Sequence, residues 1–318
     1  MRNHFAVRIC VIFNPAARGD KARHFRRLLG DMAAGDCAFK ATAAAGDARR
    51  LAAESVAEGF DLIVAAGGDG TVNEVLNGLG DAPNGFEKTR LGVLPLGTVN
   101  VLARELKIPA QPERAWEILR RGREFKMDLP RVEFSANGKI ERRYFVQLAG
   151  AGFDARAIEL ASWKLKRKIG PLAYVVAGLK ALRERKPKIT VRASGESAAR
   201  EDARPANPVG ENFSGELVLI GNGKFYGGSF SVFPGADLRD GRLDVCVFPK
   251  VNLPALLRYA PNFLFRRTLP EKLVGRIRAG KFELISETPA AFELDGEWAG
   301  HLPATFSVER EKLRVVAP

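Results

Sequence analysis

The sequence predicts an α/β domain followed by a β-sandwich domain. The chain has 318 residues, a length typical of two domains. Strand-like and helix-like segments alternate up to about residue 128, whereas short strand-like runs separated by turn residues fill the rest. Hydrophobic residues make up 46% of the chain and charged residues 27%, which favours a folded protein over a disordered one. We therefore expect one domain over residues 1–128 and a second over residues 129–318.

The first domain is predicted to contain a parallel sheet with flanking helices. Its strand candidates are short apolar runs, over residues 7–13, 37–42, 61–66 and 91–95. Its helix candidates cover residues 18–33, 47–57, 71–79, 100–106 and 112–121. Asp47 is expected to be the N-cap of the second of these helices. Alternation of this kind is typical of parallel strands joined by helical crossovers.

The second domain is predicted to be an antiparallel β-sandwich. Its strand candidates cover residues 131–136, 140–148, 189–193, 216–221, 242–248, 281–286, 291–295 and 305–308. Helical segments over residues 155–185 and 254–265 interrupt them, and residues 194–213 have the composition of a loop. Many short strands separated by turn residues are the pattern of a sandwich or barrel-like domain.

The net charge of +13 predicts an anionic partner. Residues 1–128 contain 19 Lys+Arg and 16 Asp+Glu, a net +3, and residues 129–318 contain 31 and 21, a net +10. The second domain therefore carries most of the positive charge. Because no nucleic-acid recognition motif accompanies it, a phosphorylated molecule or an acidic membrane surface is favoured.

The cysteines and histidines predict neither a disulfide framework nor a metal site. The three cysteines are far apart in sequence and are Cys10, Cys37 and Cys246. The histidines lack a second histidine at metal-binding spacing and are His4, His24 and His301. The sequence also has no signal-peptide pattern at its start and no run of roughly 18 apolar residues. We expect a cytoplasmic protein that does not cross a membrane.

Glycine-containing turns predict a phosphate-binding edge in the first domain. Three of them stand between a strand candidate and a helix candidate, at residues 14–19, 67–71 and 95–100. A fourth, weaker one combines Thr42 with Gly46-Asp47. The carboxyl ends of parallel strands lie at one edge of a sheet, where glycine backbones and helix N-termini can bind phosphate. The Walker A and GxGxxG patterns are both missing, which disfavours P-loop and dinucleotide-binding proteins.

These turns, taken in order, resemble a known family. Gly67-Gly68-Asp69-Gly70-Thr71 with Asn73-Glu74 resembles the nucleotide signature of the diacylglycerol kinase catalytic domain family, which includes bacterial lipid kinases and sphingosine kinases. The turn Asn14-Pro15, the block at 95–100 with Ala103-Arg104, and Asp295-Gly296-Glu297 match further parts of the family pattern. The resemblance covers nearly the whole chain and implies an ATP-dependent kinase acting on a lipid hydroxyl. It implies an α/β nucleotide domain like that of NAD kinases and phosphofructokinases, and a β-sandwich lipid domain whose last strand, about 312–316, returns to the first domain.

The resemblance also implies roles for individual residues. The residues implied to contact ATP are Asn14, Pro15, Ala16, Ala17, Arg18, Gly19, Thr42, Gly68, Asp69, Gly70, Thr71, Val72, Asn73, Glu74 and Thr98. Glu297 falls on the general base. The loop Asp237–Arg242 resembles a structural magnesium loop, with Asp240 and the carbonyls of Asp237 and Arg242 as ligands. The residues implied in a carboxylate–water–magnesium network are Asp69, Asp128 and Asp295. The cofactors expected are therefore ATP and Mg²⁺.

The residue chemistry agrees with this assignment. Phosphoryl transfer needs an acceptor hydroxyl in line with the γ-phosphate, magnesium to spread the charge, and a carboxylate near the hydroxyl. If Asp295 and Glu297 lie on one strand, both side chains face the same side and point into one cleft. The alternative is that Asp295-Gly296 is only a hairpin turn, and the other motifs lead us to prefer catalysis. Arg104 suits a phosphate or, equally, the carbonyls at a helix C-terminus.

Two basic segments predict contact with an anionic membrane. Residues 164–188 contain nine Lys/Arg and one Glu around an apolar middle, and residues 258–278 contain six basic residues and one acid. Cationic residues mixed with aromatic and aliphatic ones are typical of interfacial segments, although a solvated helix face is the alternative for either one alone. We expect peripheral association with the inner membrane face. The oligomeric state is left open, and a homodimer is compatible with the sequence.

The predicted function is therefore the ATP-dependent phosphorylation of diacylglycerol or a related long-chain lipid alcohol. One alternative is a soluble small-molecule kinase of the NAD-kinase type, against which residues 95–100 and the basic second domain argue. Another is a non-catalytic regulator that binds nucleotide or lipid. Arg18 and Val101 depart from the family pattern and favour that regulator, whereas Asp69 and Glu297 are intact and oppose it.

Overall fold

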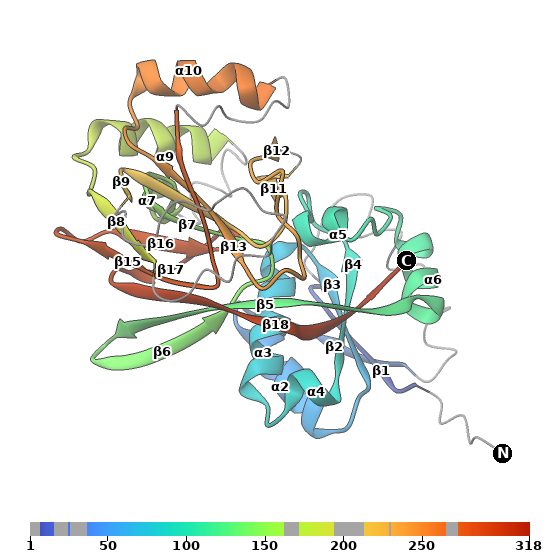
Figure 1. The fold of residues 1–318 in the computed structure, drawn as a ribbon. Coiled ribbons are helices and arrows are strands. Elements are labelled where there is room, and N and C mark those ends of the chain that lie inside the picture. The colour runs from blue at the N-terminus through green and yellow to red at the C-terminus, as the bar shows by residue number, and fades with distance from the viewer. Residues whose placement is uncertain are drawn as a thin grey trace. The chain divides into compact units, whose positions relative to one another are not determined.

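The computed structural model describes residues 7–15, 25, 37–161, 172–193, 213–228, 230–264 and 273–318. The chain divides into two compact units, of which unit 1 is Met1–Leu129 with Arg310–Pro318 and unit 2 is Pro130–Glu309. Two 14-residue strands, β5 (Arg123–Ala136) and β18 (Ala304–Ala317), each run from one unit into the other (Figure 1). The chain therefore returns to unit 1 with its last residues.

Unit 1 is built on a parallel sheet. Its strands are ordered β2 (Cys37–Ala41), β1 (Ile9–Phe13), β3 (Leu62–Gly67), β4 (Arg90–Pro95) and then the end of β18. The neighbouring pairs β1–β2, β1–β3 and β3–β4 are all parallel. All six residues of β3 are buried, as expected for a central strand covered on both faces. The parallel sheet predicted for this half of the chain is confirmed.

Helices follow the strands of unit 1. Those in the described residues are α2 (Asp47–Ala57), α3 (Asp69–Asp81), α4 (Gly85–Lys88), α5 (Val101–Glu105) and α6 (Pro112–Arg121). Helix α6 starts with proline, which fits the first helical position, and ends with two arginines that complement the helix dipole. Helices α2 and α3 touch so closely that a Cβ on Gly78 would lie 2.1 Å from the Arg49 carbonyl oxygen. The helix predicted over 18–33 lies outside the described residues, apart from Phe25.

The expected N-cap of α2 is wrong. The N-cap is Gly46, whose φ of 88° is left-handed, and Asp47 is the first helical residue. The Asp47 carboxylate accepts hydrogen bonds from the backbone N–H groups of Ala43 and Ala44, at 2.8 and 3.0 Å. Asp47 thus closes the turn before the helix instead of capping the helix. A residue farther along the chain accepts the N–H groups at the helix N-terminus.

Unit 2 contains two antiparallel sheets. One has the order β14 (Gly275–Ala279), β13 (Leu243–Phe248), β10 (Leu217–Gly221), β7 (Leu148–Gly152), β16 (Ala291–Leu294) and β17 (Glu297–His301). The other contains the start of β18, β15 (Lys281–Ser286), β8 (Ile189–Ala193) and β9 (Phe213–Gly215), with β6 (Lys139–Tyr144) paired to β5. The remaining elements are the ribbon β11 (Phe225–Tyr226) and β12 (Phe230–Ser231), and the helices α7 (Phe153–Leu160), α9 (Leu172–Arg183) and α10 (Leu253–Leu264).

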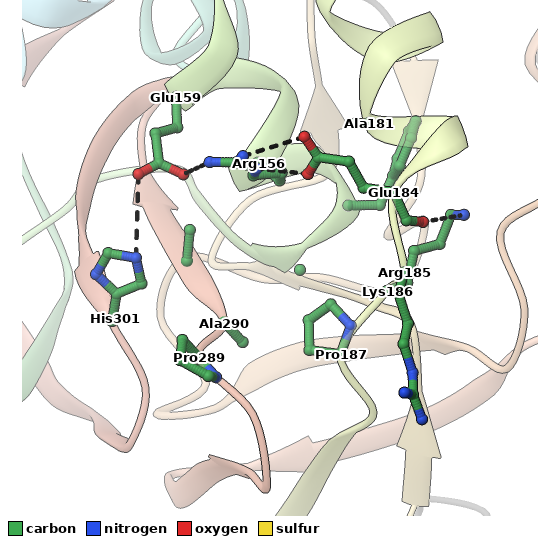
Figure 2. Close-up of a pocket in the computed structure, with 13 residues that line it drawn as sticks. Arg156, Glu159, Ala181, Glu184, Arg185, Lys186, Pro187, Pro289, Ala290 and His301 are labelled. Atoms are coloured by element: carbon green, nitrogen blue, oxygen red, sulfur yellow. Dashed lines mark hydrogen bonds and ion pairs between the residues drawn. The ribbon is translucent and has the colours of Figure 1, made fainter.

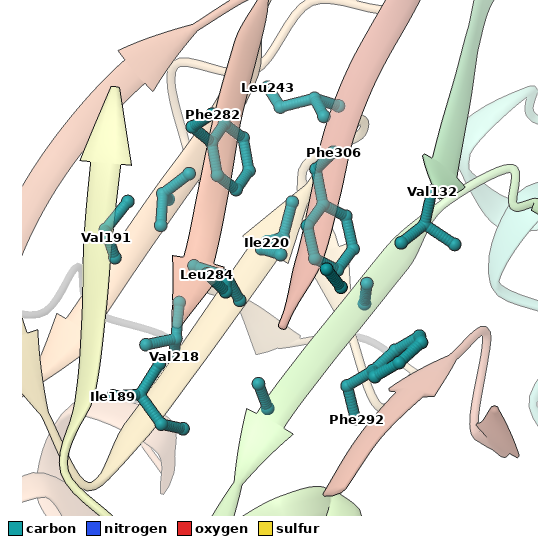
Figure 3. Packing of buried hydrophobic residues seen from close by; sticks show 14 of the residues in the cluster. Val132, Ile189, Val191, Val218, Ile220, Leu243, Phe282, Leu284, Phe292 and Phe306 are labelled. Carbon is teal, nitrogen blue, oxygen red and sulfur yellow. The ribbon is translucent and has the colours of Figure 1, made fainter. Parts of the chain in front are cut away.

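One apolar core joins the two sheets of unit 2. Phe282 and Phe306 come from the sheet of β15 and β18, and their rings stack with centroids 5.5 Å apart (Figure 3). Phe292 comes from the other sheet and meets Phe306 edge to face at 6.0 Å. Val218 and Ile220 of β10 are fully buried in the same cluster. Two sheets that face each other across a shared core form the predicted sandwich.

The strand predicted over 140–148 is wrong, because it is two strands. Strand β6 ends at Tyr144, and β7 begins at Leu148 in the other sheet. The predicted helix over 155–185 corresponds to α7 and α9, and residues 162–171 between them lie outside the described residues. Among the residues that the structure describes, no helix is long and apolar enough to cross a membrane.

Candidate active site

Two glycine turns of unit 1 are joined by backbone contacts. The turns follow β3 and β4, and the N–H groups of Leu96 and Gly97 both donate to the Gly67 carbonyl, at 2.9 and 3.2 Å. A Cβ on Gly97 would lie 2.4 Å from the Cα of Gly68, so the two backbones meet where no side chain fits. This close approach of the two backbones explains why residue 97 is glycine.

Asp69 ties the first of these turns to the start of α5. Its carboxylate accepts the N–H of Asn100 at 2.9 Å and the N–H of Val101 at 2.7 Å. Burial raises the pKa of Asp69, and the two N–H donors and then the Arg104 charge act against that rise. Asn100, at a φ of 54°, closes the second turn by accepting from Gly97 N–H and donating to its carbonyl. Asp69 and Asn100 therefore fix both turns in one arrangement.

Other predicted nucleotide residues have identifiable local roles. Glu74 accepts the N–H groups of Gly46 and Ala48 at 2.9 and 3.0 Å, so it caps α2. Thr42 donates its N–H to the Phe13 carbonyl at the end of β1. The first contact links α3 to the start of α2, and the second links the residue after β2 to the end of β1.

The structure bears on two further predictions, the role of Arg104 and the turn at residues 14–19. The exposed Arg104 donates from Nε to the Val99 carbonyl at 2.8 Å, ahead of α5, so the C-terminal cap considered from the sequence is wrong. Asn14 and Pro15 follow β1, whereas the remaining residues of that turn lie outside the described residues: Ala16, Ala17, Arg18 and Gly19. A phosphate role for Arg104 stays a prediction.

Asp128 is fully buried in β5. Its Oδ1 accepts the N–H of Glu311 at 2.8 Å, at a point where β18 has a left-handed residue, Glu311, with a φ of 46°. The carboxylate thus satisfies a backbone group that a regular strand pair would have satisfied. The magnesium network predicted for Asp128 stays a prediction.

The predicted magnesium loop at Asp237–Arg242 has an arginine beside its carboxylate. Asp240 accepts the N–H of Arg242 at 2.9 Å, and the guanidinium of Arg278 pairs with both Asp240 and Asp244. Oxygen donors of this kind suit a hard cation, but Arg278 already balances the Asp240 charge. No group of three or more His, Cys, Asp or Glu side chains with metal-binding geometry occurs in the described part of the chain. Magnesium at this loop stays a prediction.

The hairpin between β16 and β17 corrects the predicted geometry of Asp295 and Glu297. Asp295 and Gly296 form its two-residue turn, with φ values of 49° and 88°. The left-handed turn breaks the strand alternation, so the two carboxylates do not share a face as expected. Asp295 is buried, and its carboxylate accepts from Val146, Gln147 and Leu148 N–H at 2.9 to 3.1 Å. Glu297, the first residue of β17, is exposed.

The structure adds a buried acidic cluster that the sequence analysis missed. Glu293 of β16 is fully buried, with Oε2 accepting the Gly296 N–H at 2.6 Å and Oε1 having no hydrogen-bond partner among the described residues. Asp154 of α7 accepts the hydroxyl of Tyr226. A Cβ on Gly150 would lie within 3.0 Å of an oxygen of both acids. The sequence signal that could have revealed this cluster is Glu293, an acid inside an otherwise apolar strand.

Burial raises the pKa of Glu293 well above its ordinary value, and the charge of Asp154 raises it further. The folded state therefore keeps a proton that the unfolded chain loses above about pH 4.3. Stability contributed by this group is full below that pH and falls as the pH rises toward the folded pKa. We expect Glu293→Gln to gain stability over the parent between pH 5 and 8, measured by denaturant unfolding. The control is Glu283→Gln, at a half-buried acid. The prediction would be contradicted if the free energies of unfolding of Glu293→Gln and the parent differed by the same amount at every pH.

Comparison with known proteins decides the family. The family model described as "Diacylglycerol kinase catalytic domain" matches residues 8–132, and the "YegS C-terminal NAD kinase beta sandwich-like domain" matches residues 147–317. A protein named diacylglycerol kinase from Bacillus subtilis is 31% identical over 314 residues, covering 97% of this chain and 95% of its own. The chain belongs to the diacylglycerol kinase family. One from Staphylococcus saprophyticus is 30% identical, covering 97% of this chain and 94% of its own.

Membership in the diacylglycerol kinase family makes the chain a phosphotransferase with an alcohol acceptor. The family is one of lipid kinases, and its members use ATP. The fold agrees. A crystal structure of a diacylglycerol kinase from Bacillus anthracis superposes with a TM-score of 0.68 at 20% identity, covering 98% of this chain and 97% of that one. The predicted family, the kinase class and the α/β plus β-sandwich fold are therefore confirmed.

Proposed function

We propose that this member of the diacylglycerol kinase family transfers the γ-phosphate of ATP to the hydroxyl of diacylglycerol or a closely related lipid alcohol. The observation that carries the proposal is Glu297, an exposed carboxylate at the start of β17 beside a turn that Asp295 holds rigid. Relatives named diacylglycerol kinase that match over 97% of the chain support the choice of acceptor.

The nucleotide site is assigned to the joined turns of unit 1. Phosphate groups need backbone N–H donors and close approach, and Gly68 and Gly97 provide a surface without side chains. The N-terminus of α3, directly after Gly68, adds the favourable end of a helix dipole. Thr71 and Thr98 offer hydroxyl donors on the two turns. Magnesium enters as the partner of the ATP phosphates, where it would spread their charge, and no protein ligand is assigned to it.

Glu297 is assigned as the general base. The acceptor hydroxyl loses its proton to a Glu297 oxygen while its own oxygen bonds to the γ-phosphorus and the bond to the β-phosphate oxygen breaks. Asp295 positions it: the hairpin turn next to Glu297 is fixed by three N–H donors on one carboxylate and by the Glu293 contact to Gly296. A rigid support of this kind is what a positioned base requires.

A membrane surface is the proposed source of the lipid, and α10 is the proposed contact. Leu253 and Leu257, one helical turn apart, are 60% and 66% exposed, while Tyr259 of the same helix is buried against Phe248. Between Asp244 and Glu271 the sequence has four basic residues and no acid. Exposed leucines flanked by cations fit an acidic bilayer interface.

We expect Leu257→Asp to weaken binding to phosphatidylglycerol vesicles by about tenfold or more, because burying a leucine contributes roughly 1.5–3 kcal/mol. Cosedimentation at several salt concentrations measures this. Ile140→Asp, at an 83% exposed aliphatic residue on β6, is the control and should bind as the parent does. Equal binding by both variants and the parent would remove α10 from the interface.

An acceptor panel tests the proposed function. The purified protein is given ATP, magnesium and, in separate reactions, diacylglycerol, monoacylglycerol, sphingosine, undecaprenol and NAD, and products are identified by mass. Phosphorylated diacylglycerol as the fastest product is expected. Phosphorylated NAD without lipid product would support the small-molecule kinase instead. No phosphorylated product, together with measurable ATP binding, would support the regulator.

A further inference from the structure

A cavity lies on one side of unit 2. It has a volume of about 290 Å³ and is bounded by α7, the residues after α9, and the strands β16 and β17 with the loop before them (Figure 2). Its polar side chains are Arg156, Glu159, Glu184, Arg185, Lys186 and His301. The remaining wall is apolar or backbone. All these elements belong to unit 2, so the cavity does not depend on the other unit.

The two acidic side chains of the cavity share one arginine. Arg156 lies between two glutamates (Figure 2) and donates to Glu184 from Nε at 2.8 Å and from Nη2 at 3.1 Å. Its Nη1 donates to Glu159 at 2.7 Å. Two carboxylates thus share one guanidinium, and the other oxygen of Glu159 lies 4.0 Å from Nε2 of His301. With one guanidinium between two carboxylates, this group keeps a net charge of −1 when His301 is counted as neutral.

Two cations of the cavity lack a carboxylate partner. Arg185 is exposed and has no hydrogen bond or ion pair with any residue that the structure describes. Lys186 donates from Nζ to the carbonyls of Leu182 and Glu184, at 3.0 and 3.3 Å, so its charge meets only backbone oxygens. Lys186 thereby also offsets the negative end of the α9 dipole. Arg185 and Lys186 reverse this charge, because three cations and two carboxylates give the lining a net charge of +1, which favours an anion.

The size and the apolar wall restrict the ligand further. Pockets for complete small ligands start at about 300 Å³, so this cavity suits a group of headgroup size and excludes a lipid with two acyl chains. Ala181, Pro187, Pro289 and Ala290 give carbon surface beside the cations. A bare inorganic anion would leave that surface uncovered. A phosphate carried on a short polyol can pair its charge with the cations and cover the carbon surface with the polyol.

We propose that this cavity binds the glycerophosphate group, with Arg185 as its main phosphate contact. Two sources share this chemistry, the headgroup region of an anionic phospholipid and a free glycerol phosphate. The cavity touches β17 at His301, the opposite end of that strand from Glu297. The inference stands on the cavity alone and does not require the proposed phosphoryl transfer.

The test compares two arginines at the end of α9. Arg185 lines the cavity, whereas Arg183, the last residue of α9, is also exposed and does not line it. Isothermal titration of the full chain with sn-glycerol 3-phosphate, without ATP or lipid substrate, should show binding that Arg185→Ala weakens at least tenfold. Arg183→Ala should bind as the parent does. Because Arg185 is exposed and makes no hydrogen bond or ion pair with the described residues, its variant should also unfold at the parent's temperature.

Further arms identify the source and the outcomes that overturn the proposal. Stronger binding to phosphatidylglycerol than to phosphatidylcholine vesicles, lost in Arg185→Ala, identifies a lipid headgroup. Binding of glycerol phosphate alone, with vesicles bound equally by parent and variant, identifies the free metabolite. Equal losses in Arg183→Ala and Arg185→Ala mean general charge attraction and overturn the proposal. Inorganic phosphate bound as tightly as glycerol phosphate, or no binding of glycerol phosphate, also overturns it.

Discussion

Glu297→Gln is expected to lower the turnover number with diacylglycerol by about 10²–10⁴-fold, the range that general-base catalysis supplies. The amide keeps the shape of the side chain but cannot accept the hydroxyl proton. Because the substitution removes only the proton acceptor, we expect the dissociation constant for ATP to stay unchanged. Steady-state kinetics and ATP titration of the same preparation measure both quantities.

The matched control is Glu287→Gln, which removes one exposed acid of the same unit after β15. It should keep the parent's turnover number and its ATP affinity. A Glu297→Gln enzyme that retains more than a tenth of the parent's turnover would contradict the assignment of the base. A variant that loses ATP binding instead would place Glu297 in nucleotide binding.

Asp295→Asn is expected to have the largest effect on stability, a loss of roughly 3 kcal/mol or more in the free energy of unfolding. The Asp295 carboxylate accepts three backbone N–H groups, from Val146, Gln147 and Leu148. An asparagine must turn its own NH₂ group toward at least one of these donors, and it loses the charge that strengthens all three contacts. Urea unfolding followed by circular dichroism measures the difference.

The two substitutions in this hairpin separate support from chemistry. Asp295→Asn should lose both stability and turnover, whereas Glu297→Gln should lose turnover and unfold at the parent's urea midpoint. The contrast follows from burial, because Asp295 is 8% exposed and Glu297 lies at the surface. Equal stability of Asp295→Asn and the parent would show that the three N–H contacts do not hold the hairpin.

The sequence predicts those elements whose signals are local. Helices α2 and α6 begin and end at the residues predicted, since the signals lie within each segment: apolar spacing and an initial acid in α2, and an initial proline and two terminal arginines in α6. The glycine turns after β3 and β4 were likewise predicted from short patterns. Their direct contact through Gly68 and Gly97 was not, because it joins two segments about thirty residues apart.

Contacts between distant residues explain the errors. Between β6 and β7, the N–H groups of Val146 and Gln147 donate to the Asp295 carboxylate, which is nearly 150 residues away in the sequence. No local pattern encodes such a partner. The same applies to Glu74, which caps α2 from α3, and to Glu293, whose burial depends on the packing of three elements. The geometry predicted for Asp295 and Glu297 was wrong, because a left-handed turn interrupts the strand, and their catalytic role stays a prediction.

Transfer of a labelled phosphoryl group tests the central claim most directly. ATP whose terminal γ-phosphate oxygens are ¹⁸O is incubated with the purified protein, magnesium and vesicles of diacylglycerol in phosphatidylglycerol. All three labelled oxygens travel with the phosphorus in a phosphoryl transfer. We predict phosphorylated diacylglycerol carrying all three, at a rate that Glu297→Gln lowers at least a hundredfold. Label found only in inorganic phosphate or in a phosphorylated dinucleotide, with the lipid unlabelled, would contradict the account.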